Sequence, residues 1–465
     1  MNVARVLLAV LLVQSFALPA VYAGDKPYKR AIVFAGNNLD TAEFLGIYDA
    51  AVDEGKAPDL IVASCGGSLA AMIIKAFPNR DERNAFMKSP TGYALYKTLA
   101  NGNDLGVRDF ISRKFYEIDS FSRRNQNFFN NKNENTNAAT LERTLEAEGQ
   151  QITYHQPWSR TVPNLFSKTA IDIAQDISPA GARNRLNQRF TEGKGGSDVS
   201  VVILGSRSHF GPQDIGKEVQ ANSPLFSEVH FTDEKTARYL KGSRAFAPSQ
   251  FSGTAVADQV EVVTDATLAE AARASVSDPW LVAPLKKDGQ YYFTGATNIN
   301  PNNVAKKLAS QVIGNYSTAF DDFLAQNVLY AAFGFDGNAV LKRQFVVPTT
   351  YSVDMTDKNS RGFPQVSPQW WKNKNLEVKM GPPSTLSEFK EIFDVQYAAG
   401  KRLAKEALLQ GPYYRGHIKK RELDNGNNSV TDTDEQATQF EEKYPNLYRD
   451  DAHVPVEALQ VGTPR

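Results

Sequence analysis

The segment from residue 30 to residue 77 constrains the fold most strongly, because it alternates two kinds of apolar pattern. Apolar runs of strand length occupy residues 30–35 and 58–63, and each is followed by a stretch with helical periodicity, at 41–54 and 68–77. Strand, helix, strand and helix in this order predict a parallel sheet covered by helices, and therefore an α/β fold.

The same alternation continues along the chain. Apolar runs predict further strands at residues 199–204, 228–232, 260–264 and 291–294, and helical periodicity predicts helices at 266–274, 303–313, 316–331 and 386–409. Residues 123–139 are rich in asparagine and have no period, so we expect a surface insertion there. We expect one domain over residues 24–345, an extension over 346–420 that packs on it, and a polar, mobile tail over 421–465.

The first 23 residues have the features of a secretory signal. Arg5 precedes an apolar run at residues 6–12, and Pro19 and Ala23 supply a breaker and the small side chain that signal peptidases require. A membrane anchor is the alternative, but the run is short for a hydrocarbon layer of ~30 Å. We therefore expect cleavage before Gly24, export to a periplasm or to the extracellular medium, and no transmembrane segment in the mature chain.

The charge composition excludes several kinds of partner. Lys plus Arg and Asp plus Glu number 52 each, so no net field favours nucleic acid. The 5 histidines are scattered without metal-ligand spacing, and we expect neither a metal site nor a cofactor. Residues 368–374 pair tryptophans with lysines, which is typical of membrane-interface segments and equally of packed cores, so peripheral membrane contact remains one of two interpretations.

Three separated stretches carry motifs in a fixed order. Residues 31–41 read AIVFAGNNLDT, residues 58–71 read PDLIVASCGGSLAA, and residues 274–280 and 289–301 read ASVSDPW and GQYYFTGATNINP. In this order they resemble the patatin-like lipid acyl hydrolases, whose corresponding motifs are G-G-G-x-R-G, D-x-I-x-G-x-S-x-G and D-G-G-x-x-x-N-x-P. The resemblance spans residues 24 to about 341. It implies a three-layer α/β/α sandwich of patatin type and a Ser–Asp dyad that hydrolyses acyl esters of lipids.

The resemblance places Cys65 at the nucleophile position of this family. The turn before the helix would hold the thiol at a helix N-terminus, where partial positive charge favours a thiolate, and the free pKa of a thiol is ~8.5. Gly66 and Gly67 allow a close turn, whereas Ala63 replaces the first glycine of the family's motif. A lone cysteine is otherwise usually a small buried hydrophobe.

The resemblance places Phe293 where the family has its catalytic aspartate. A phenyl ring cannot accept a proton, so the general base is missing at this position. Asp288, Asp336 and His209 are candidate substitutes. The two aspartates also fit ordinary turns, and the histidine also fits an ordinary hydrogen-bonded residue.

The loop that corresponds to the family's oxyanion hole is altered as well. Gly36 is kept, but Asn37 and Asn38 replace glycines, and Asp40 stands where the family has arginine. A carboxylate there would repel the developing oxyanion, and loss of a donor costs ~10²-fold or more in rate. Asp40 and Glu43 also have the spacing of a helix-capping box, which accounts for Asp40 without a catalytic role.

The sequence leaves open whether the protein is an enzyme. One hypothesis is an exported lipid-binding protein with a degenerate dyad and weak or no hydrolysis, supported by the changes at Phe293, Asp40 and the loop asparagines. The alternative is a Cys65-dependent hydrolase or acyltransferase acting on lipid esters. A third hypothesis is a structural secreted protein whose pocket is filled by Phe293 and Trp280. The first two predict a lipid or acyl-ester ligand.

Overall fold

The structure is a computed structural model. It describes residues 26–36, 41–101, 162, 165–166, 172–191, 198–218, 223–245, 256–279, 282–297, 301–316, 349–355 and 385–409. The strands are β1 (Tyr28–Phe34), β2 (Leu60–Ala63), β3 (Ser200–Ser208), β4 (Phe226–Thr232), β5 (Glu261–Val263), β6 (Leu285–Lys287), β7 (Gln290–Thr294), β8 (Ala309–Tyr316) and β9 (Tyr351–Asp354). The α-helices are α2 (Thr41–Asp53), α3 (Gly66–Ala76), α4 (Arg80–Met87), α5 (Pro90–Asn101), α8 (Arg183–Leu186), α9 (Glu234–Leu240), α11 (Leu268–Ser275), α12 (Pro301–Leu308) and α16 (Leu386–Leu409), and short 3-10 helices are η1 (Pro212–Asp214) and η2 (Gly295–Thr297).

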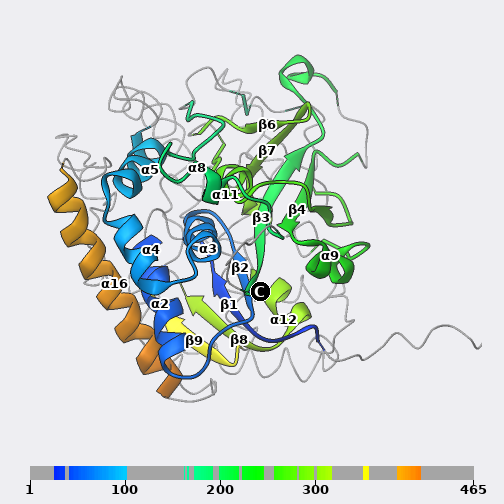
Figure 1. Ribbon diagram of the computed structural model, residues 1–465. Helices are drawn as coiled ribbons and strands as arrows, with labels where there is room; N and C mark the ends of the chain where they lie inside the picture. The colour runs from blue at the N-terminus through cyan, green and yellow to red at the C-terminus, as the bar shows by residue number, and fades with distance from the viewer. Residues whose placement is uncertain are drawn as a thin grey trace, which may run out of the picture.

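The strands form one mostly parallel sheet in the middle of the molecule (Figure 1). Its order is β5-β4-β3-β2-β1-β8-β9, and β7 and β6 join it beside β3. Strand β1 pairs in parallel with β2 and β8, and β2 pairs in parallel with β3. The antiparallel pairs are β3 with β4, β3 with β7, and β6 with β7. The predicted α/β fold with a mostly parallel sheet is confirmed.

Two apolar layers separate this sheet from the helices on its faces. Strand β2 is buried over its whole length, as expected for a central strand covered on both faces. Ile61 and Ala63 point into one core, which they share with α2, α3, α11 and α16. Leu60 and Val62 point into the other, which they share with residues of α9 and α12. The arrangement is a three-layer α/β/α sandwich. Helix α16, the last described helix of the chain, packs on the layer that contains α2.

Helix α16 has the bounds that its periodicity predicts and packs closely against α2. A Cβ atom on Gly400 would lie 2.0 Å from the carbonyl oxygen of Glu43, so only glycine allows this approach. Next to the contact, Asp49 and Arg83 form a buried ion pair, and the Tyr397 hydroxyl donates to Asp49 at 2.7 Å. The helix is therefore part of the packed core.

The prediction of a helix over residues 303–313 is wrong in its second half. Helix α12 ends at Leu308, and β8 begins at the next residue, with Gln311 paired to Arg30 and Ile313 to Ile32. A short apolar run fits a buried strand and a buried helix equally well, and here pairing with β1 decides for the strand. The signal, the Asn-rich stretch, the helix predicted at 316–331, the Trp-rich stretch and the polar tail lie outside the described residues.

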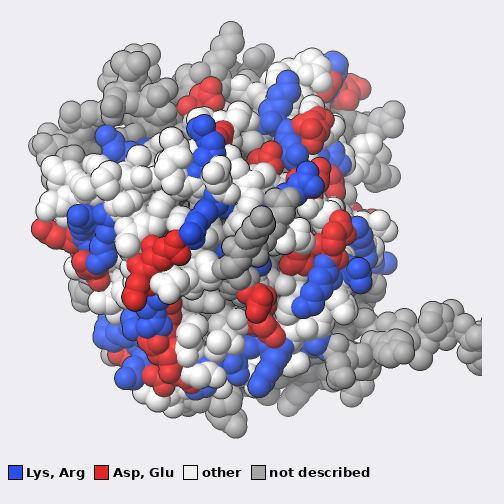
Figure 2. All heavy atoms as spheres, viewed as in Figure 1, with Lys and Arg blue, Asp and Glu red and all other residues white. Residues whose placement is uncertain are grey.

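Charged side chains of both signs are intermixed over the face shown in Figure 2. This face carries no large area of one sign, consistent with equal numbers of basic and acidic residues. Among the helices that the structure describes, none is long and apolar enough to cross a membrane.

Candidate active site

The turn between β2 and α3 has the geometry of a nucleophile elbow. Cys65 has φ 49° and ψ −127°, although a Cβ atom makes positive φ uncommon. Among the described residues, the other non-glycine residue with positive φ is Asp288, which lies in the turn between β6 and β7. A Cβ on Gly67 would lie 2.2 Å from the carbonyl oxygen of Phe34, so this glycine lets α3 begin directly against β1. The sharp strand–turn–helix that the resemblance implies is present.

Hydrogen bonds hold Cys65 in this conformation. Its backbone N–H donates to Ser275 Oγ at 2.8 Å, and the Ser68 hydroxyl donates to its carbonyl oxygen at 2.5 Å. Ser275 Oγ in turn donates to the carbonyl oxygen of Leu204 on β3, at 2.7 Å. Backbone strain of ~1–3 kcal/mol persists only where the surroundings enforce it, and these bonds do so at Cys65.

The thiol of Cys65 is free and its residue is partly exposed to solvent. Burial raises the pKa of this thiol, the negative charge of Asp278 raises it further, and the Gly66 N–H lowers it. The expectation of a thiolate favoured by the helix N-terminus is therefore wrong in direction. At neutral pH Cys65 is protonated, so a nucleophilic role requires a base.

A carboxylate that the sequence motifs do not mark as a site residue acts electrostatically on this thiol. Asp278 follows α11 and is partly exposed, and burial raises its pKa to about 6, while a hydrogen bond with the Thr294 side chain lowers it. Thr294 Oγ1 also donates to the carbonyl oxygen of Ser275 at 3.0 Å, and its N–H donates to that of Ser277 at 3.0 Å. Asp278 is thus connected through Thr294 and Ser275 to the backbone of Cys65. The sequence signal was an aspartate inside the stretch 274–280 that carries the resemblance.

Phe293 is fully buried and packs within a group of aromatic rings. Its ring centroid lies 5.7 Å from that of Phe166 and 6.4 Å from that of Phe226. Because side chains alternate along a strand, Thr294 points to the opposite face of β7, toward the end of α11. The residue of β7 that faces the elbow is therefore Thr294, through its hydroxyl, whereas Phe293 belongs to the apolar core.

The structure does not bring His209 to Cys65. Residue Ile203 of β3 is in register with Ala63, so His209 lies about four residues beyond the level of Cys65, roughly 13 Å along the strand direction. His209 Nε2 is hydrogen-bonded to Ser227 Oγ at 2.8 Å, and burial lowers the pKa of its ring. It is an ordinary hydrogen-bonded histidine.

The two aspartates considered as substitutes are not placed at the elbow either. Asp288 lies in the β6–β7 turn, where its carboxylate is 3.1 Å from Lys287 Nζ and its side chain is 75% exposed. Asp336 lies outside the described residues. In the described residues there is no group of three or more His, Cys, Asp or Glu that could hold a metal ion.

Only the first residue of the altered oxyanion loop is described. Gly36 has φ +61°, and its N–H donates to the carbonyl oxygen of Ser64 at 3.2 Å, so the loop begins directly beside the elbow. Asn37, Asn38 and Asp40 lie outside the described residues.

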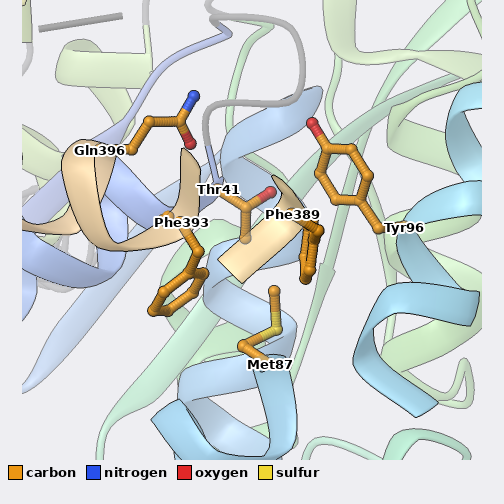
Figure 3. A pocket seen from close by; sticks show the side chains of 7 residues that line it. Thr41, Met87, Tyr96, Phe389, Phe393 and Gln396 are labelled. Atoms are coloured by element: carbon orange, nitrogen blue, oxygen red, sulfur yellow. The ribbon is translucent and has the colours of Figure 1, made fainter. Parts of the chain in front are cut away.

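A narrow apolar hollow opens where α2 begins (Figure 3). It is lined by Thr41, Ala42, Met87, Tyr96, Phe389, Phe393 and Gln396. Thr41 Oγ1 is buried and has no hydrogen-bond partner among the described residues. The space holds about one water molecule, so the hollow as it stands is too small for an acyl chain.

No family model and no curated protein matches this chain. Among solved structures, the chain is similar to VipD from Legionella pneumophila at 12% sequence identity and a TM-score of 0.30, over 93% of this chain and 79% of that one. A likeness at this level carries no argument about function, so any function must be argued from the residues of this chain.

Proposed function

We propose that the protein is an acyl-transfer enzyme of the patatin-like type that uses Cys65 as its nucleophile on an ester of a lipid. The observation that carries the proposal is the strained backbone at Cys65, at the end of a central parallel strand and the start of a helix. A fold keeps such strain where the side chain is needed in an exposed position. Lipid esters are proposed from the motif resemblance.

The presence of a carboxylate at the elbow favours the enzyme over a protein that only binds lipid. Three changes speak against hydrolysis in the sequence, at Phe293, at Asp40 and at the loop asparagines. The charge of Asp278, which acts on the thiol, supplies a candidate for the first missing group, the base. Without Asp278, a protonated and half-buried thiol would be a poor nucleophile.

The test is ester turnover by the purified mature protein. Wild-type protein is expected to hydrolyse p-nitrophenyl butyrate, to lose this activity on treatment with iodoacetamide, and to carry an acyl group on Cys65 that mass spectrometry detects. Cys65→Ala is expected to be inactive and to show no further loss on alkylation. The second substrate is a vesicle of phosphatidylcholine, on which fatty-acid release would extend the activity to lipid esters.

Lipid binding without turnover is the competing outcome. A wild-type protein that hydrolyses none of these esters, forms no acyl adduct and is nevertheless stabilised against heat by a fatty acid would refute the enzyme and support the lipid-binding protein.

Export is a separate part of the proposal and is supported by the signal features of residues 1–23. Expression of the full chain in a bacterial host, followed by fractionation and N-terminal sequencing, is expected to give an exported protein that begins at Gly24. A cytoplasmic protein that retains Met1 would contradict this part alone.

A further inference from the structure

The loop that carries Asp278 is fixed by a buried arginine. Arg273 is fully buried in α11, and its guanidinium donates to Ser277 Oγ and to the carbonyl oxygen of Ala283, the latter at 2.7 Å. The Ser277 hydroxyl donates back to the Arg273 carbonyl at 2.8 Å, and Val282 N–H donates to the carbonyl oxygen of Asp278 at 2.9 Å. These bonds fix the backbone on both sides of Asp278, and a catalytic group requires such a rigid support.

The carboxylate is also connected to the nucleophile through a second element. Thr294, at the end of β7, bonds with Asp278 and with the Ser275 carbonyl, and Ser275 Oγ accepts from the backbone of Cys65. Strand β7, the end of α11 and the elbow after β2 therefore meet at one point. Asp278 and Cys65 each keep partial exposure to solvent there.

We infer that Asp278 is the general base that activates Cys65, in place of the aspartate that the motif resemblance would put at Phe293. The inference rests on the proposed function, because it assigns a role within the same acyl transfer. It adds a residue from a different element, the loop after α11, and makes Thr294 the positioning residue that orients the carboxylate.

The reaction balances with these groups and one water molecule. Cys65 Sγ attacks the acyl carbon while its proton passes to the Asp278 carboxylate, and the carbonyl oxygen becomes an oxyanion. The oxyanion collapses, the ester C–O bond breaks, and Asp278 returns the proton to the departing alcohol, which leaves a thioester on Cys65. Water then attacks the thioester while Asp278 takes its proton, and the acid leaves as the proton returns to the sulfur.

The ionisation of Asp278 agrees with this role. Its pKa of about 6 leaves the carboxylate charged at neutral pH, yet it is a stronger base than an exposed aspartate. The Thr294 hydroxyl has one proton, which it can donate to the charged Asp278 or to the Ser275 carbonyl.

The test compares Asp278→Asn with Asp288→Asn, a matched removal of an exposed carboxylate in the β6–β7 turn. Asp278→Asn is expected to lower kcat/KM for p-nitrophenyl butyrate by ~10²–10⁴-fold and to abolish the rise of kcat/KM through pH 6, while Asp288→Asn leaves both unchanged. Thr294→Val is expected to move the acidic limb of the wild-type profile to higher pH, because it removes a bond that lowers the pKa of Asp278.

A second measurement tests proximity without turnover. Because the charge of Asp278 raises the pKa of the Cys65 thiol, Asp278→Asn is expected to speed alkylation by iodoacetamide at pH 8, while it slows ester hydrolysis. Circular dichroism verifies that each variant is folded.

The outcomes separate the inference from the proposed function. A wild-type enzyme that depends on Cys65 but loses less than fivefold in Asp278→Asn, with its acidic limb intact, overturns the inference and leaves the proposed function standing. A wild-type protein that neither turns over ester nor forms an acyl adduct overturns both. An alkylation rate that is the same in wild type and Asp278→Asn shows that the carboxylate is not beside the sulfur and also overturns the inference.

Discussion

Asp278→Asn is expected to make the protein more stable at neutral pH while it removes activity. In the native protein burial raises the pKa of Asp278 from 3.8 to about 6, whereas the unfolded chain keeps an ordinary value of ~3.9. Between these values the native state binds the proton more tightly than the unfolded state. The free energy of unfolding of the wild type therefore falls as pH rises from about 4 to about 6, and stays low above it.

The size of this effect follows from the rise in pKa. A rise of about two pH units corresponds to ~3 kcal/mol. Solvent reaches Asp278 in part, and Asn keeps an acceptor for the Thr294 hydroxyl, so the expected gain at pH 7.5 is ~1–2 kcal/mol. In a domain of a few hundred residues, a gain of that size in the free energy of unfolding corresponds to an increase in Tm of roughly 2–6 °C.

The assay is thermal unfolding of the wild type, Asp278→Asn and Asp288→Asn at intervals from pH 4 to pH 8. The difference between wild type and Asp278→Asn should be largest at pH 7.5–8 and should vanish near pH 4, and Asp288→Asn should follow the wild type throughout. A lower Tm for Asp278→Asn at pH 7.5, or a difference that does not depend on pH, would refute the reasoning. Either result would mean that the Asp278 carboxylate stabilises the native state, and that its burial does not lower the free energy of unfolding.

Two further substitutions test the fold and the elbow. Arg83→Met removes the fully buried partner of Asp49, whose remaining ion pair is with the partly exposed Arg80, and is expected to lower the free energy of unfolding in urea by ~3 kcal/mol. Arg80→Met leaves the buried Arg83–Asp49 pair in place and should cost under ~1 kcal/mol. Cys65→Gly relieves the strain of the positive φ, because glycine adopts this conformation freely. The substitution is expected to raise the free energy of unfolding by ~1 kcal/mol and to abolish ester hydrolysis. Urea titration and the ester assay on the same sample measure the two effects.

The sequence predicted the central part of the fold because local pattern and tertiary position agree there. Strand β2 is an unbroken apolar run bounded by Pro58 and the glycines of the elbow, and α16 has a long helical period. Strands β6 and β9 were not predicted, because LKK and YSVD are too short to establish a period and become strands only through pairing with β7 and β8. Strand β8 differs from these two, because its short apolar run fits a buried helix as well as a strand and only pairing with β1 decides between them.

The motif predicts the elbow, whereas it does not predict the proposed base, Asp278. The motif puts the carboxylate at the position of Phe293, and Asp278 precedes Pro279 in a stretch with the composition of an ordinary turn. Only the packing of α11 against β3 and β7 brings the segment that carries Asp278 to the elbow. The direction of the Cys65 pKa was also wrong, because a sequence shows the helix that follows but does not show how deeply the sulfur is buried.

The raised pKa of Cys65 explains how a cysteine can occupy a position that the patatin-like motif gives to serine. With a thiol that holds its proton and a carboxylate that titrates near pH 6, the resting pair is a neutral nucleophile beside a charged base, as a Ser–Asp pair would be. Cys65→Ser should therefore keep at least about a tenth of the wild-type ester hydrolysis and lose its sensitivity to iodoacetamide. A folded Cys65→Ser that is as inactive as Cys65→Ala would mean that a preformed thiolate reacts, and a thiolate beside a charged Asp278 contradicts the electrostatics of this site.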